Sequence, residues 1–366
     1  MINLSVKGWP FQNATFKQPR ITLSHDIVLN FDTMMANITS VALKSDFLDL
    51  AFSGVVKNFQ EDLSGKLLVS GKGRLNEIVL VFGKMISLPP DLKLSGDVNL
   101  DLAGEGDLNK VGFKGTVECK NLEVNAAFLN NYPYRETSLQ LTPDAVLALN
   151  DKKTSVVLNT VNVKSGVVKG DIKGTLDSEL SMDLNAKLAT NLSLLGKNLR
   201  GVLPDSFPDK GQLLSDLSIR GNLDQTLTVK GNHTIDGAQI VLQPAPDEQP
   251  ASATASTLSF PKLALVHDVD YQGGRDNISL KSIKLDSSFG TVKASGMLSR
   301  ISKDLLTECT GELALAMEEV TKLIKDLVPE GLTMKGKGDI TFGCKGTLSP
   351  LDDKPLLSSW NGDGSL

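Results

Sequence analysis

The sequence predicts a mostly-β protein, in which an elongated antiparallel sheet curls into a groove and carries a few short amphipathic helices. Three observations predict this fold. Apolar and polar side chains alternate along many short segments, a frame of proline and glycine recurs three times, and one segment in each copy has helical periodicity instead. We therefore expect the 366 residues to form about three repeats of roughly 120 residues each.

The repeats are recognised by a proline, a glycine seven residues later, and a second glycine ten residues after the first. This frame occurs at Pro89, Gly96 and Gly106, at Pro204, Gly211 and Gly221, and at Pro329, Gly336 and Gly346. The first glycines of successive copies are 115 and 125 residues apart. We divide the chain accordingly into β-repeats at 1–124, 125–241 and 242–366. The strand pattern at 358–366 has nothing after it to pair with, so we expect a fragment of a longer chain.

The segment between the two glycines of each frame has the period of two that is typical of a strand with one wet face. In the first copy, Val98, Leu100 and Leu102 alternate with polar residues. At the same alternate positions, counted from the first glycine of the frame, the second copy has Leu213, Leu217 and Ile219 and the third copy has Ile340, Phe342 and Cys344. We call this shared set of alternate positions the apolar parity. Each frame therefore predicts one strand, bracketed by glycines that permit tight turns.

One segment of each repeat is predicted to be a short amphipathic helix. Near 313–328, apolar residues recur every three or four positions, and Glu318 precedes Lys322 by four. The matching segments lie near 192–203 and near 75–87, and each is followed by the proline of its frame. The stretch 243–257 is rich in Pro, Ala, Ser and Thr, which predicts a mobile loop within the third repeat.

Composition and motifs argue against several classes of function. The net charge is −5, and 38 basic residues are mixed with 43 acidic ones, so no basic stripe indicates a nucleic-acid partner. The three histidines, His25, His233 and His267, have no helical spacing, and no nucleotide-binding or hydrolase motif is present. We expect no metal, no cofactor and no catalytic residues, and the carboxylates fall on the polar parity of the strands, as on a solvated face.

Neither the cysteines nor the apolar runs indicate a metal site, a disulfide framework or a membrane-spanning helix. Cys119, Cys309 and Cys344 lie far apart without CxxC spacing, so we expect buried thiols rather than a zinc knuckle or a disulfide framework. No apolar run approaches the roughly 18 to 20 residues that cross a bilayer as a helix, and residues 1–11 do not resemble a signal peptide.

A sheet of this kind presents one long apolar face that three short helices cannot cover. Two sheets packed face to face, a closed barrel, or a curled groove filled by an apolar ligand would each solve this problem. We favour the groove. Its predicted lining consists of Val98, Leu100, Leu102, Leu213, Leu217, Ile219, Ile340 and Phe342. The alternative is that these side chains pack against a second sheet, in a dry core.

The layout of a helix ending in "LP" followed by "DKGQLLSDLSIRGNLDQTLTVKGNHTIDGAQI" at 209–240 resembles the AsmA-like proteins of Gram-negative envelopes, as does "LLSSWNGDGSL" at 356–366. The resemblance implies a β-groove anchored in the inner membrane by an N-terminal helix, extending through the periplasm and carrying phospholipid toward the outer membrane. This sequence lacks that anchor, so membrane attachment would come from a segment outside it.

The expected function is therefore non-enzymatic binding and transfer of phospholipid in the periplasm, contributing to outer-membrane biogenesis, with unknown envelope proteins as partners at either end. A β-rich scaffold or adhesin with a dry sandwich core is the alternative. An enzyme acting on polysaccharide ranks last, because it would need two carboxylates about 5 to 10 Å apart in a cleft, and no acidic cluster lies on the apolar parity.

Overall fold

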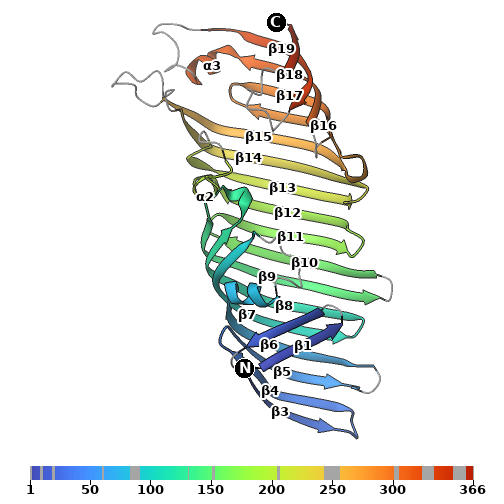
Figure 1. Cartoon of the computed structure of the whole chain (residues 1–366). Helices are drawn as coiled ribbons and strands as arrows, with labels where there is room; N and C mark the ends of the chain where they lie inside the picture. The colour runs from blue at the N-terminus through green and yellow to red at the C-terminus, as the bar shows by residue number, and fades with distance from the viewer. Residues whose placement is uncertain are drawn as a thin grey trace. The chain divides into compact units, whose positions relative to one another are not determined.

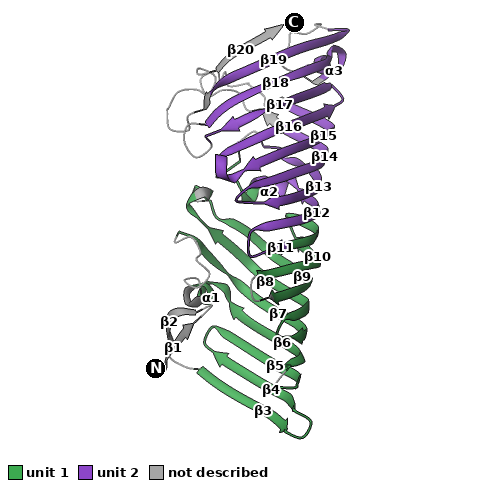
Figure 2. Cartoon of the chain, turned by 90° about the vertical axis from the view of Figure 1, so that its right-hand side faces the viewer, with its two compact units in different colours: residues 1–175, 197–204 green, residues 176–196, 205–366 purple. Residues whose placement is uncertain are grey.

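The protein is mostly β. The computed structural model describes residues 2–8, 11–18, 21–59, 62–82, 91–130, 132–150, 153–203, 207–242, 256–300, 305–323, 334–348 and 360–365. Strands hold 77% of the chain, and the sheet is antiparallel and does not close on itself. These features confirm the predicted fold class, including its few short helices. The chain divides into two compact units, Met1–Thr175 with Lys197–Pro204 and Leu176–Gly196 with Asp205–Leu366 (Figure 2).

In unit 1, strands follow one another in sequence order, each antiparallel to the one before (Figure 1). A separate hairpin, β1 (Ile2–Gly8) and β2 (Phe11–Gln18), precedes the main sheet. The main sheet comprises β3 (Ile21–Asn30), β4 (Met35–Ser45), β5 (Leu48–Lys57), β6 (Ser64–Arg74), β7 (Lys93–Asp107), β8 (Lys110–Asn125), β9 (Tyr134–Asn150), β10 (Lys153–Ser165) and β11 (Val168–Asp177), whose last residues belong to unit 2. Helix α1 (Leu75–Phe82) follows β6, and a 3₁₀ turn covers Ala127–Leu129.

Unit 2 has the same order of antiparallel strands. Its elements are β12 (Ser181–Asn191), α2 (Leu192–Asn198), β13 (Lys210–Asn222), β14 (Thr226–Leu242), β15 (Ser256–Gln272), a 3₁₀ turn (Gly273–Arg275), β16 (Asn277–Ser287), β17 (Gly290–Ser299), β18 (Leu305–Ala316), α3 (Met317–Leu323), β19 (Lys337–Leu348) and β20 (Trp360–Ser365). In the described part of the chain, a helix thus follows every sixth strand. The boundaries drawn at 124 and 241 fall near the ends of β8 and β14, and the three-repeat division remains a prediction.

Helices α2 and α3 differ from the predicted ranges. Helix α3 begins at Met317 and not near 313, because residues 313–316 pair with the neighbouring strand β19 and so belong to β18. Helix α2 ends at Asn198, and the residues from 199 to 203 form turns. Residues 83–87 and 324–328 of the predicted helices lie outside the described residues, as does most of the predicted loop 243–257, whose last two residues already belong to β15.

The prediction of turns at both frame glycines is wrong for Gly96 and Gly211. Both lie inside strands, where the pairing register shifts between Ser95 and Asp97 and between Lys210 and Gln212. Their φ values of 142° and 122° belong to a region that side chains rarely adopt. Glycine adopts this backbone geometry at the two bulges without the steric cost that a side chain would bring. A sequence pattern cannot distinguish a bulge glycine from a turn glycine, since both are selected for the same conformational freedom.

A buried carboxylate stabilises the turn between β10 and β11 by accepting hydrogen bonds from it. Glu136 on β9 is only 6% exposed. Its Oε1 accepts hydrogen bonds from the Ser165 hydroxyl at 2.8 Å, the Tyr134 hydroxyl at 2.9 Å and the Val167 amide at 3.2 Å. Its Oε2 accepts one from the Gly166 amide at 3.2 Å. Burial and the neighbouring carboxylate raise the pKa of Tyr134, so its hydroxyl stays a donor.

Candidate functional site

The predicted lining residues of unit 1 lie on one face of its sheet, which we call the apolar face of unit 1. Along β7, the side chains of Val98, Leu100 and Leu102 are half-buried, while the polar residues between them are exposed. The strand pairing places Leu100 in a row that crosses the sheet. This row is Leu23, Leu43, Leu50, Gly71, Leu100, Val117, Leu141 and Val163. Seven of these eight side chains are aliphatic, so the face is a continuous hydrocarbon surface across β3 to β10.

Gly71 does not leave a hole in this surface. A Cβ atom at Gly71 would lie 2.5 Å from Cδ2 of Leu50 and 3.4 Å from Cγ of Leu100. The two leucines therefore lean over the glycine from both neighbouring strands and cover its backbone. The glycine lets larger side chains meet above it, which keeps polar backbone atoms away from the apolar face.

Helix α1 lies along one end of the same face. It contacts β6 and β7, and Cδ1 of Ile78 would lie 2.9 Å from a Cβ at Gly73. Gly73 pairs with Val98. Val98 is therefore next to the helix, and Leu100 and Leu102 are progressively farther from it along β7. The helix borders the apolar face without covering it, since Leu100 and Leu102 stay half-exposed.

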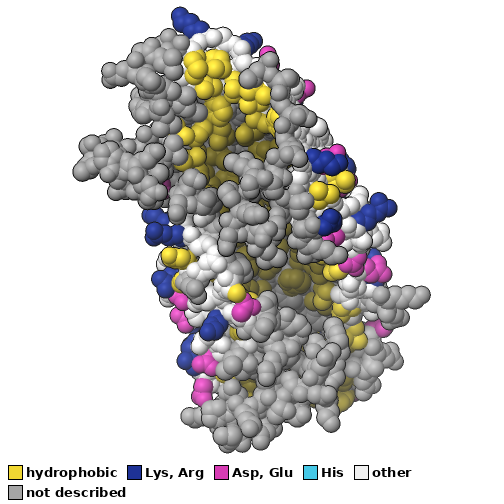
Figure 3. All heavy atoms as spheres, turned by 45° about the horizontal axis from the view of Figure 1, so that its top comes forward, with side chains coloured by type: hydrophobic (Ala, Val, Ile, Leu, Met, Phe, Trp, Pro, Cys, Tyr) yellow, Lys and Arg dark blue, Asp and Glu magenta, His cyan; other side chains and the backbone are white. Residues whose placement is uncertain are grey.

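The five predicted lining residues of unit 2 also share one face, the apolar face of unit 2. Leu217 and Phe342 belong to a single row. This row is Ala186, Leu217, Gly231, His267, Ile283, Ala294, Gly311 and Phe342. Leu213, Ile219 and Ile340 lie in parallel rows of the same parity and are half-buried. Figure 3 shows hydrophobic side chains gathered in a hollow over the C-terminal strands, with charged side chains toward its margins.

The apolar faces are accessible. Among the described residues, no large side chain is fully buried, and the most buried apolar ones are few and scattered (Leu129 and Leu192 at 3% exposure are the largest below 5%). A dry core between two packed sheets would instead bury whole rows of leucine and isoleucine. Every predicted lining residue is half-buried, as expected for a surface that is accessible to an apolar ligand.

The opposite side of each sheet, its polar face, carries the charges. Lysine or arginine lies directly opposite aspartate or glutamate on neighbouring strands. These ion pairs are Lys66–Glu105, Lys72–Asp49, Lys114–Asp144, Arg220–Asp183, Lys187–Asp216, Lys230–Asp268, Lys293–Glu312 and Lys345–Glu308. Cross-strand pairs of this kind add modest stability and help to fix register. The carboxylates of these pairs are therefore engaged in ion pairs on a solvated surface.

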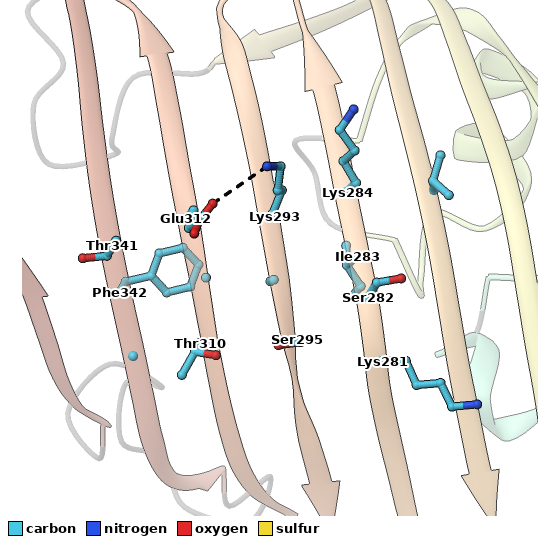
Figure 4. A pocket seen from close by; sticks show the side chains of 14 residues that line it. Lys281, Ser282, Ile283, Lys284, Lys293, Ser295, Thr310, Glu312, Thr341 and Phe342 are labelled. Carbon is cyan, nitrogen blue, oxygen red and sulfur yellow. Dashed lines mark ion pairs between the residues drawn. The ribbon is translucent and has the colours of Figure 1, made fainter.

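A cavity of about 1110 Å³ lies against strands β15 to β19. Most of its lining residues have the parity of the polar face, among them Lys284, Lys293 and Glu312. Figure 4 shows Lys293 directed at Glu312 on the neighbouring strand, and their charged atoms are 3.9 Å apart. This cavity has both charged and apolar lining side chains, because the row of the apolar face that contains Ile283 and Phe342 also borders it.

Two histidines interrupt the apolar face of unit 2, and sequence analysis did not foresee their meeting. His233 on β14 and His267 on β15 stack with ring centroids 5.1 Å apart. Their Nε2 atoms are 3.0 Å apart, and Nδ1 of His233 lies 2.9 Å from the hydroxyl of Ser215. Both rings converge over Gly231. The parity of the strands could have placed each histidine on this face, but only the register brings them together.

The histidine pair predicts that the stability of unit 2 depends on pH. Burial, and then the proximity of His267, lower the pKa of His233 below its ordinary value of 6.5. The unfolded chain therefore binds a proton at a higher pH than the folded one, and stability that is present above pH 6.5 is lost as the pH falls below it. We expect His233→Asn to reduce the drop in the denaturant midpoint between pH about 7.5 and about 5.5.

The exposed third histidine, His25 on β3, provides the control for this pH dependence. His25→Asn should leave the drop as it is in the unmodified chain. An unchanged drop in His233→Asn would show that the pair is not its source.

The described residues contain no group of three or more His, Cys, Asp or Glu side chains that could hold a metal ion. Within the same part of the chain, no helix has the length and apolar character needed to cross a bilayer. Comparison with known proteins finds no matching family model, no matching curated protein and no matching solved structure.

Proposed function

We propose that this chain binds the acyl chains of phospholipid on the apolar faces of its open sheet and acts as a non-enzymatic lipid-transfer module. The observation that carries this proposal is the row of aliphatic side chains in unit 1 from Leu23 to Val163, interrupted by Gly71 alone, in which no side chain is fully buried. Contiguous exposed apolar surface of this extent on a protein marks a site of interaction with an apolar partner.

The energetics of an acyl chain suit such a surface. Each methylene removed from water contributes about 0.8 kcal/mol, so a chain of about 16 carbons gains roughly 13 kcal/mol when it is fully sheltered. Neighbouring positions along a row offer similar aliphatic contacts, so a lipid can move between them without a large barrier. No catalytic group is required for this activity.

The cellular setting of the proposal rests on the resemblance to AsmA-like proteins. On that basis we propose a periplasmic location, attachment to the inner membrane through a segment outside this sequence, and a contribution to outer-membrane biogenesis. The polar faces, with their ladders of ion pairs, suit an aqueous compartment on the other side of the sheet.

A β-rich scaffold is the second candidate, and it would leave the apolar faces packed against protein. The half-exposure of Leu100 and Leu217 favours the lipid-binding function over that candidate. The two functions make opposite predictions about what the purified protein carries.

Native mass spectrometry of the protein, gently purified from a bacterial host, tests the proposed function. We expect adducts with the masses of phospholipids, and the same lipids in an organic extract of the sample. A folded protein with a lipid-free mass and an empty extract would contradict the proposal and favour the scaffold. A soluble β-protein of similar size, purified in parallel, controls for lipid carried over from the host membranes.

A further inference from the structure

Two cysteines that are distant in sequence face each other on the apolar face of unit 2. Cys309 on β18 and Cys344 on β19 are direct cross-strand partners. The pairing between these strands runs without a register shift from Leu305 and Leu348 to Ala316 and Lys337. The pair is therefore fixed by twelve consecutive pairings and does not depend on a loop.

The geometry of an antiparallel pair permits a covalent bond between these residues. Directly opposite Cα atoms in antiparallel strands lie about 4.5 to 5.5 Å apart, and disulfides span Cα separations of about 4.4 to 6.8 Å. Both side chains have the same parity and point to the same face. Because the two strands are paired without a register shift, a disulfide requires rotation about the side-chain bonds and no change in strand pairing.

The surroundings leave room for the bond. The third residue in this row is Gly296 on β17, which pairs with Cys309. A Cβ at that position would lie 2.7 Å from Cβ of Cys309, so any larger residue would crowd the cysteine. Both cysteines are half-exposed, and a small thiol reagent can therefore reach them.

We propose that Cys309 and Cys344 form a reversible disulfide that joins β18 to β19 across the apolar face of unit 2. With a small-molecule disulfide such as oxidised glutathione as the oxidant, the thiolate of one cysteine attacks a glutathione sulfur and releases one glutathione thiolate. The thiolate of the second cysteine then attacks Sγ of the first cysteine in this mixed disulfide, breaks its bond to glutathione and releases the second glutathione thiolate. The protein loses two protons and two electrons, and one oxidised glutathione becomes two reduced molecules.

The disulfide would close a long loop of the chain. The two cysteines are 35 residues apart in sequence, and the loop between them contains helix α3. Closing a loop of this length restricts the unfolded chain and stabilises the folded one. The bond would hold the edge of the apolar face together in an oxidising compartment, where protein disulfides persist.

The rate of bond formation depends on pH. Burial, and then the neighbouring Cys344 thiol, raise the pKa of Cys309 to about 11. Since the thiolate is the nucleophile, exchange with oxidised glutathione should be slow at neutral pH and faster at alkaline pH. A slow reaction at neutral pH is therefore part of the expected behaviour, and incubation must be followed to completion.

The test uses the full chain, reduced and then incubated with oxidised glutathione at mildly alkaline pH. We expect an intact mass lower by two hydrogen atoms, a proteolytic fragment pair that contains Cys309 linked to Cys344, and a higher melting temperature than in the reduced protein. Cys309→Ser and Cys344→Ser should each abolish the mass loss, and Cys119→Ser, which changes the single buried cysteine of unit 1, should retain it.

Three free thiols at the end of the incubation, or a linkage that includes Cys119, would overturn the proposal. Stable glutathione adducts on Cys309 or Cys344 without closure would also overturn it, because they would show that the two sulfurs cannot reach bonding distance. None of these outcomes depends on whether the protein binds lipid.

Discussion

Leu217→Asp is expected to reduce phospholipid binding by about tenfold or more, while Leu214→Asp on the same strand leaves binding unchanged. Leu217 lies on the apolar face of unit 2, between Ala186 and Gly231. A carboxylate there must stay hydrated, and it removes contacts with two or more methylenes of a bound chain. At about 0.8 kcal/mol per methylene, the loss amounts to at least 1.5 kcal/mol, roughly a factor of ten.

Leu214 is a matched control because it has the same side chain on the same strand, three residues away, and differs in the face on which it lies. It is 42% exposed on the polar face of β13. Binding can be measured as displacement of a fluorescent acyl-chain probe from delipidated protein, with circular dichroism to confirm the fold of each variant.

Unit 1 offers an independent copy of the experiment. Leu100→Asp changes the middle of the aliphatic row on β7, and Leu68→Asp changes a leucine that is 50% exposed on the polar face of the neighbouring strand β6. We expect the first to weaken probe binding and the second to have no effect. If Leu100→Asp or Leu217→Asp unfolds the protein while its control stays folded, the apolar side chains form a dry core, and the scaffold becomes the better account.

The amino-acid pattern predicted the face of each lining residue because a strand has a period of two and one wet face. Parity alone assigned Val98, Leu100 and Leu102 to the same side, and the structure places them there. The charges were predictable for the same reason. Pairs such as Lys293 and Glu312 have the opposite parity, so the polar face follows from the pattern that defines the apolar one.

Register was not predictable, and the unforeseen features all depend on it. His233 and His267 are 34 residues apart and Cys309 and Cys344 are 35 apart, and no motif connects the members of either pair. Their meeting requires a specific alignment of two long strands, and the alternation of apolar and polar residues does not fix that alignment. A shift of a single residue would turn one partner of each pair to the other face.

Glu136→Ala is expected to destabilise the protein by about 3 kcal/mol, because it removes the acceptor of four hydrogen bonds in a buried site. The amide of Gly166 and the hydroxyls of Ser165 and Tyr134 would lose this partner, and only those that water can reach would recover one. The Val167 amide would keep its second acceptor, the Ser165 hydroxyl at 3.1 Å. The turn between β10 and β11 should then open more often, which raises the rate of hydrogen exchange at the amides of residues 166 and 167.

Two further variants separate the loss of the acceptor from a general effect of removing a charge. Glu136→Gln keeps one acceptor oxygen at the same place and should lose only part of the stability. Glu105→Ala removes a carboxylate whose side chain is 74% exposed and 3.7 Å from Lys66, and should change the free energy of unfolding by less than about 0.5 kcal/mol. If Glu136→Ala is no more destabilising than Glu105→Ala, the four hydrogen bonds contribute nothing net, and the β10–β11 turn must be held by the packing of Val167 and its neighbours instead.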